Sequence, residues 1–205
     1  MRPLDRQYTM IIGDNSGIAV QSFDSTAENY NPEFVAYLNA WQGLSKTYYT
    51  ITEVEHIKAL PKNDVVKPAD YNVTSLDELR FFNGLSELPF RWSPPVESVI
   101  YPNSITDVSN QAWILNRYVK YFEIGNAVTT IQPYIFQTNT QPTTFVCRTA
   151  APPVWVNTNG YSVAQRAICD LFVPAESIAL YQQASVWNEF KSINAIDPSK
   201  KKQSL

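Results

Sequence analysis

Apolar side chains recur at helical spacing in one long segment of the chain, residues 31–43 (NPEFVAYLNAWQG). Four of them stand at positions i, i+3, i+4 and i+7, namely Phe34, Tyr37, Leu38 and Trp41. The segment starts with asparagine and proline, the residues favoured at the N-cap and the first helical position, and it ends with a glycine suited to closing a helix. The pattern predicts a helix over residues 31–43 with one face in the core.

The segment that follows, residues 47–60 (TYYTITEVEHIKAL), predicts a long β-strand that ends before Pro61. Glu53 and Glu55 are two positions apart, so on a regular strand they point to the same face. His56, the only histidine of the chain, stands beside them. An acid/base pair for glycoside hydrolysis is one interpretation of the two glutamates. We favour the alternative, in which they lie at a subunit contact or at the rim of one.

Turn residues divide the remainder into short segments. GDNSG predicts a short hairpin within residues 9–23, and Ser75 with Glu78 forms a capping box that predicts a short helix ended by Asn83 and Gly84. After residue 89 the chain consists of β-rich runs, and the turn at Gly125-Asn126 predicts a hairpin within residues 118–137. We detect no internal repeat. About eight short strands with helices inserted in loops predict an all-β fold, a single jelly-roll β-sandwich.

Composition agrees with one globular domain over residues 1–205, with a flexible basic tail at about 197–205. Charged residues make up 17% of the chain, the aromatic content is 13% and the formal net charge is −3. No run of 18 apolar residues is present, so no membrane insertion is expected. Cys147 and Cys169 stand in apolar surroundings and are expected to be buried thiols, although a disulfide between neighbouring strands is an alternative.

Motifs that carry catalysis are missing from the sequence. It contains no GxSxG, P-loop, GxGxxG or HExxH pattern, and one histidine with two distant cysteines does not make a metal site. We therefore expect no enzyme activity, no catalytic residue, no bound metal and no cofactor.

Two segments together resemble the single jelly-roll capsid proteins of small icosahedral viruses, in particular those with circular single-stranded DNA genomes. The first segment runs from the predicted helix into the predicted strand, and the second contains the capping box. The matching positions are Pro32, Glu33, Phe34, Leu38, Tyr49, Ile51, Val54, Pro61, Asp70, Thr74, Ser75, Asp77, Glu78, Leu79 and Phe90. The match covers roughly residues 28–95, and the arginine- and lysine-rich arm common in that family is missing from this sequence.

The resemblance implies a structural coat protein that self-assembles into an icosahedral shell around a genome, found in the virion and assembled in the nucleus or cytoplasm of a host cell. Its partners would be further copies of itself, packaged nucleic acid and a host receptor. The candidate subunit-interface residues are Tyr48, Tyr49, Glu53, Glu55, His56, Trp92 and Tyr101. The candidate nucleic-acid contacts are Arg80, Arg91, Arg117, Lys200, Lys201 and Lys202.

Two further expectations accompany this interpretation. The alternative function is that of a secreted or cell-surface carbohydrate-binding module, in which exposed Trp and Tyr stack on sugars. Within a shell, His56 would gain charge near pH ~6.5 beside a glutamate of a neighbouring subunit and make that contact sensitive to pH.

Overall fold

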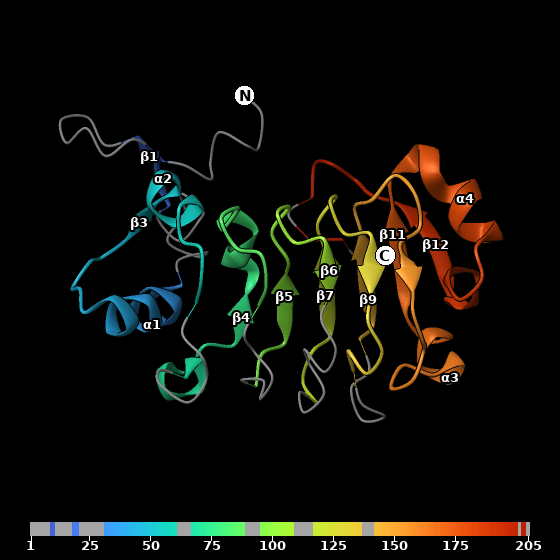
Figure 1. Cartoon of the computed structure of the whole chain (residues 1–205), viewed down its shortest axis with the longest axis horizontal. Helices are drawn as coiled ribbons and strands as arrows, with labels where there is room; N and C mark the ends of the chain where they lie inside the picture. The colour runs from blue at the N-terminus through green and yellow to red at the C-terminus, as the bar shows by residue number, and fades with distance from the viewer. Residues whose placement is uncertain are drawn as a thin grey trace.

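The computed structural model describes residues 9–10, 18–20, 31–60, 67–88, 95–108, 117–136, 142–200 and 202–203. Its main element is a six-stranded parallel sheet in the order β12-β11-β9-β7-β5-β4, whose strands lie side by side across the molecule (Figure 1). In chain order they are β4 (Ser75–Leu76), β5 (Ser98–Ile100), β7 (Tyr121–Ile124), β9 (Thr144–Cys147), β11 (Asp170–Val173) and β12 (Ser192–Ala195).

A smaller parallel sheet accompanies the large one and has the order β10-β8-β6. Its strands are β6 (Asp107–Val108), β8 (Thr130–Ile131) and β10 (Val154–Trp155). Each follows one strand of the large sheet, so three successive coils of the chain contribute one strand to each sheet. The chain therefore winds as a solenoid, in which every coil contacts the coils before and after it.

The coils repeat with a constant length in the middle of the chain. Three successive pairings of the large sheet join Ser75 to Ser98, Ser98 to Tyr121, and Tyr121 to Thr144. Hydrogen bonds between neighbouring coils accordingly join residues 23 positions apart, as from Asn126 to Asn103. The coil that reaches β11 is longer because it contains the short helix α3 (Val163–Arg166).

The predicted all-β jelly roll is wrong, because jelly-roll sandwiches are antiparallel whereas both of these sheets are parallel and the fold is mixed α/β. The structural repeat was also missed. Apolar residues do recur at the paired positions, but the side chains between them change in every coil. The predicted hairpin around Gly125 is also wrong, because β7 and β8 do not pair: the turn leads from β7 in the large sheet to β8 in the small one.

One core cluster lies inside the coils and is rich in aromatic rings. The positions next to one another in successive strands, Val99, Phe122, Phe145 and Leu171, are all fully buried. Rings of neighbouring coils touch edge to face or tilted, as for Phe122 and Phe145, whose ring centroids are 5.3 Å apart. Trp155 of the small sheet packs against the same cluster, so both sheets share one core. Trp187, with 2% of its surface exposed, belongs to the same core and packs against Trp155.

The amino-terminal part confirms the predicted helix and the first hairpin. Helix α1 (Pro32–Gln42) has Asn31 as its N-cap, which accepts a hydrogen bond from the Phe34 backbone N–H, and it ends at Gly43 in the left-handed conformation. The strands β1 (Thr9–Met10) and β2 (Ile18–Val20) pair antiparallel as expected, and β3 (Tyr49–Thr50) pairs with β2.

The long strand predicted for residues 47–60 is wrong. Only β3 is extended, and helix α2 (Ile51–Glu55) follows it at once. The predicted capping box is wrong as well: the 3₁₀ helix η4 (Asp77–Phe81) begins after Leu76 without a side-chain cap, while the Glu78 carboxylate accepts a hydrogen bond from Asn31. A capping box does occur between Ser162 and Gln165 at α3.

The remaining helical segments are short. They are η3 (Pro68–Tyr71), η5 (Ala175–Ser177), α4 (Ile178–Gln183) and η6 (Trp187–Glu189). In Figure 1, α1 and α2 lie at one end of the large sheet, while α3 and α4 lie at the other. The solenoid thus has helical segments at both ends of its described part.

Close stacking of the coils predicts that Gly125→Ala is destabilising. A Cβ at this position would stand 2.7 Å from the Pro102 carbonyl oxygen in the preceding coil, so the backbone has to shift. We expect a loss of about 1–3 kcal/mol in the free energy of unfolding, measured by denaturant titration.

Gly43→Ala is the matched control. Gly43 has a φ of 66° but no atom within 4 Å of the added methyl group, so it loses only the backbone preference, about 1 kcal/mol. Unchanged stability of the Gly125 variant would contradict close packing of the coils.

Candidate binding face

The large sheet has a second face that points away from the main core, which we call the outer face. Side chains alternate along each strand, so the paired positions Ile100, Glu123, Val146 and Phe172 lie on this face. Tyr121 lies two positions before Glu123 and shares it. A separate hydrophobic cluster of buried side chains consists of Ile100, Tyr121, Val146 and Phe172.

The chain after β12 covers part of the outer face. Ile196 packs against the hydrophobic cluster. The residues that follow, which we call the tail loop, are 197–203, of which Lys201 lies outside the described part. Gln203 is only 2% exposed, and its backbone N–H donates to the Tyr121 hydroxyl over 3.4 Å. A polar segment distant in sequence therefore occupies the middle of the sheet.

The tail loop is closed by the Gln203 side chain. Its amide oxygen accepts from the Asp197 backbone N–H at 2.8 Å, and its amide nitrogen donates to the Asp197 carbonyl at 3.0 Å. Ser199 donates two hydrogen bonds to the Asp197 carboxylate, and these lower its pKa. The buried amide thus has partners for its oxygen and its nitrogen, which removes the desolvation penalty that an unpaired amide would carry.

Charge complementarity holds the loop to the sheet. Lys202 Nζ lies 2.6 Å from Asp77 Oδ2 and 5.3 Å from the centroid of the Tyr121 ring. Asp77 also accepts a hydrogen bond from the Ser98 hydroxyl, which orients its carboxylate. The outer face therefore offers a lysine site made of one carboxylate and one aromatic ring.

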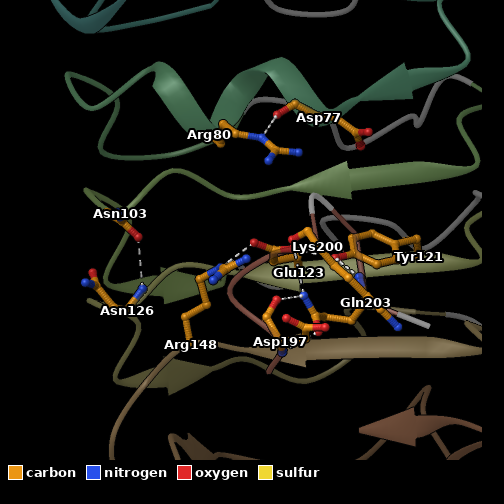
Figure 2. A network of polar contacts seen from close by, with 10 residues as sticks. All are labelled: Asp77, Arg80, Asn103, Tyr121, Glu123, Asn126, Arg148, Asp197, Lys200 and Gln203. Atoms are coloured by element: carbon orange, nitrogen blue, oxygen red, sulfur yellow. Dashed lines mark hydrogen bonds and ion pairs between the residues drawn. The ribbon is translucent and has the colours of Figure 1, made fainter. Parts of the chain in front are cut away.

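Glu123 stands at the centre of the polar network in Figure 2. One carboxylate oxygen accepts from Arg148 Nε, and the other accepts from the Tyr121 hydroxyl at 2.6 Å. Burial, followed by the neighbouring Glu123, raises the pKa of Tyr121, so its phenol keeps its proton and remains a donor. The Glu123 side chain is 3% exposed, and both of its oxygens have partners.

Two cavities lie beside this network. One of about 340 Å³ is lined by Arg80, Ile100, Asn103, Glu123 and Arg148, among others. A more open one of about 560 Å³ shares Asn103 and Arg148 and is bordered by Ile196 and Pro198 next to the tail loop. Both are large enough to receive single side chains of a ligand.

The predicted interface residues do not come together in one surface. Tyr49 is 1% exposed and donates to Asn39, and Tyr101 is 3% exposed against Phe122. Tyr48 is half-buried, and Trp92 lies outside the described residues.

The charged candidates of residues 53–56 stand on or next to α2. Glu53 pairs with Lys46, and the exposed His56 lies 3.9 Å from Glu55. Because Glu53 and Glu55 are two positions apart on a helix rather than on a strand, they do not share a face, and the geometry proposed for an acid/base pair is missing.

The predicted nucleic-acid contacts are only partly brought together. Arg80 and Lys202 both lie beside Asp77, where they contact the protein itself. Lys200 is exposed on the tail loop next to Gln203, Arg117 is exposed elsewhere, and Arg91 and Lys201 lie outside the described residues.

Sequence reasoning missed Asp77, Tyr121, Glu123, Arg148 and Gln203 as members of one site. The available signal was the 23-residue spacing that aligns Ile100 with Glu123 and Ser98 with Tyr121. No local pattern pointed to Gln203, which joins the site through the path of the chain.

Within the described residues, no group of three or more His, Cys, Asp or Glu side chains is arranged to hold a metal ion. The helices in that part of the chain include none with the length and apolarity to cross a membrane. Cys147 and Cys169 are confirmed as buried free thiols, and burial raises the pKa of Cys169 to about 12. Such thiols are poor nucleophiles at neutral pH.

Comparison with protein-family models gives no match for this chain, and a search of curated proteins finds no similar sequence.

Glu78, on η4 next to Asp77, predicts a pH dependence of stability. Burial and the neighbouring Asp77 raise its pKa from 4.5 to about 7. The folded state therefore holds the proton more tightly than the unfolded state, so this contribution is complete below pH ~4.5 and is lost as the pH rises through about 7. We expect the free energy of unfolding to fall between pH 5 and pH 8 by up to about 3 kcal/mol.

Glu78→Gln keeps the acceptor for Asn31 and removes the titrating proton. The decrease in the free energy of unfolding between pH 5 and pH 8 should therefore become much smaller. Glu97→Gln, at an exposed side chain, is the control and should show the same decrease as wild type. Urea titrations at four pH values measure all three proteins, and identical pH profiles for wild type and Glu78→Gln would refute the assignment.

Proposed function

We propose that this protein is a binding module that holds a lysine-containing polypeptide segment on the outer face of its parallel sheet. The observation that carries the proposal is the tail loop, which occupies this face with one residue almost fully buried and one lysine paired. The face is therefore complementary to a polypeptide segment of that chemistry.

The architecture supports the proposal. Solenoids expose one long sheet whose side chains stand in regular columns, and repeat proteins use such surfaces to bind extended partners. The coil length of 23 residues lies within the range of leucine-rich repeats, and the apolar positions Val119, Phe122 and Ile124 follow their L-x-x-L-x-L spacing.

The pattern of charge defines the partner further. Asp77 and the Tyr121 ring form the site for Lys202. The Tyr121 hydroxyl accepts a hydrogen bond from the backbone of Gln203, the residue after that lysine. A partner segment would place a lysine at Asp77 and a polar residue over Tyr121, as Lys202 and Gln203 do. The tail loop is then a tethered competitor for the same place.

The shell-forming coat protein and the carbohydrate-binding module remain predictions. The first was inferred from a resemblance to jelly-roll proteins, and the jelly roll itself is not the fold. No cluster of exposed tryptophans among the described residues favours the second, since Trp155 and Trp187 belong to the core.

Binding in trans tests the proposal. The double variant Lys202→Glu, Gln203→Ala releases the tail loop, and a fluorescent peptide with the sequence of residues 197–203 is then titrated by anisotropy. We expect saturable binding to the release variant and binding at least about tenfold weaker to wild type, because the tethered loop competes. Adding Asp77→Asn should weaken the peptide about tenfold, since a charge-assisted contact is lost.

Glu33→Gln on the exposed side of α1 is the matched control and should leave binding unchanged. Failure of the peptide to bind the release variant, or equal binding by the Asp77→Asn protein, would refute the proposal. Light scattering of the wild-type protein tests the coat-protein alternative, because uniform particles of high mass without peptide binding would support a shell-forming subunit.

A further inference from the structure

We propose that the cavity between Arg80 and Arg148 is a binding site for a carboxylate group. The cavity has a volume of about 340 Å³ and lies beside the strands β5 and β7, next to the polar network of the outer face. This proposal rests on the proposed function only for the source of the carboxylate. The carboxylate belongs either to an acidic side chain of the bound segment or to a free small acid.

Arg80 provides the unmatched positive charge. Its Nε donates to the Asp77 carbonyl at 2.9 Å, but its Nη2 is buried and has no hydrogen-bond partner. Among the described residues this guanidinium makes no ion pair; the Asp77 carboxylate pairs with Lys202, and the Arg80 charge acts on Glu78 only by lowering the pKa of that carboxyl slightly against the larger effect of burial. Figure 2 shows the Arg80 guanidinium pointing from η4 toward the sheet. A buried unpaired donor is costly, and an incoming acceptor would remove that cost.

Arg148 lines the same cavity from the third coil after that of Arg80. Its contact with Glu123 uses Nε and leaves the two Nη groups outside that contact, and the side chain is 35% exposed. Glu123 pairs with Arg148 and accepts from the Tyr121 hydroxyl, and among the described residues it makes no ion pair with Arg80. Two guanidinium groups and one carboxylate leave the cavity with a net positive charge.

Asn103 adds a neutral donor. Its Oδ1 accepts the Asn126 backbone N–H at 3.1 Å, which fixes the orientation of the amide and leaves its Nδ2 hydrogens outside that contact. Ile100 and Tyr101 supply apolar wall on the same cavity. This combination suits a carboxylate on a short aliphatic stem, since a guanidinium fork matches the two oxygens of a planar carboxylate.

Glutarate is the probe, titrated into the full-length wild-type protein. The measurement is the change in the NMR signals of the arginine Nε–H and asparagine side-chain groups. We expect saturable shifts at Arg80, Arg148 and Asn103, and none with neutral glutaramide. Arg80→Lys keeps the charge but loses the fork, so affinity should fall about tenfold.

Asn103→Asp is the sharpest variant. It keeps an oxygen for the Asn126 N–H, so the contact between coils is preserved, but it replaces the donor with a negative oxygen and should abolish binding. Arg117→Lys, at an exposed arginine outside the cavity, is the control and should bind glutarate like wild type.

A comparison of two peptides identifies the source. If the carboxylate belongs to the bound segment, a glutamate appended to the tail-loop peptide raises its affinity for the release variant, and Asn103→Asp cancels the gain. If it belongs to a free acid, glutarate binds and the appended glutamate gives no gain. Absent glutarate shifts, shifts that persist in Asn103→Asp, or equal binding of inorganic phosphate would each overturn the carboxylate site, whatever the tail-loop peptide does alone.

Discussion

Parallel hydrogen bonding between successive coils is the constraint on which the rest of the structure depends. Because each strand pairs in register with the strand of the coil before it, residues at equivalent places form columns that run across the sheet. One column, which includes Val99, Phe122 and Phe145, is the wall of the core. The next, with Ile100, Glu123 and Val146, forms the outer face. A single register thus decides both what is buried and what is presented.

The outer face is unusual in being closed by its own chain. An apolar cluster there would otherwise be exposed to water, and polar residues around it would lie open. Ile196 and the tail loop cover this surface, and the buried Gln203 finds its hydrogen-bond partners within the loop and at Tyr121. Contacts between residues as distant as Tyr121 and Gln203 make the face a place where one segment is recognised by another. Recognition of a second polypeptide would use the same chemistry.

Electrostatics divides the network into two sites of opposite preference. Asp77 with Tyr121 attracts a cation, while Arg80, Arg148 and Asn103 offer donors to an anion. Glu123 separates them, because it neutralises Arg148 through one oxygen and accepts from Tyr121 through the other. Neighbouring sites of opposite charge favour a partner that carries both charges at a defined spacing, and they disfavour ligands of a single sign.

Features that depend on near neighbours in the chain could be predicted from the sequence. Helix α1, with its cap at Asn31 and its end at Gly43, follows from residues within about a dozen positions, as do the first hairpin and the burial of Cys147 and Cys169. Local patterns misled where tertiary contacts compete with them. Residues 51–55 are helical although their composition favours a strand, and Glu78 turns to Asn31 instead of capping η4.

The direction of strand pairing and the set of residues that form the site depend on contacts between distant parts of the chain. A short apolar run fits a parallel or an antiparallel sheet equally well, because the alternation of side chains is the same in both. The choice between parallel and antiparallel pairing depends on partners 23 residues away. The membership of the site depends on the path of the chain that brings Gln203 to Tyr121. Those contacts are formed by stacking of whole coils, and no stretch of sequence shorter than a coil contains them.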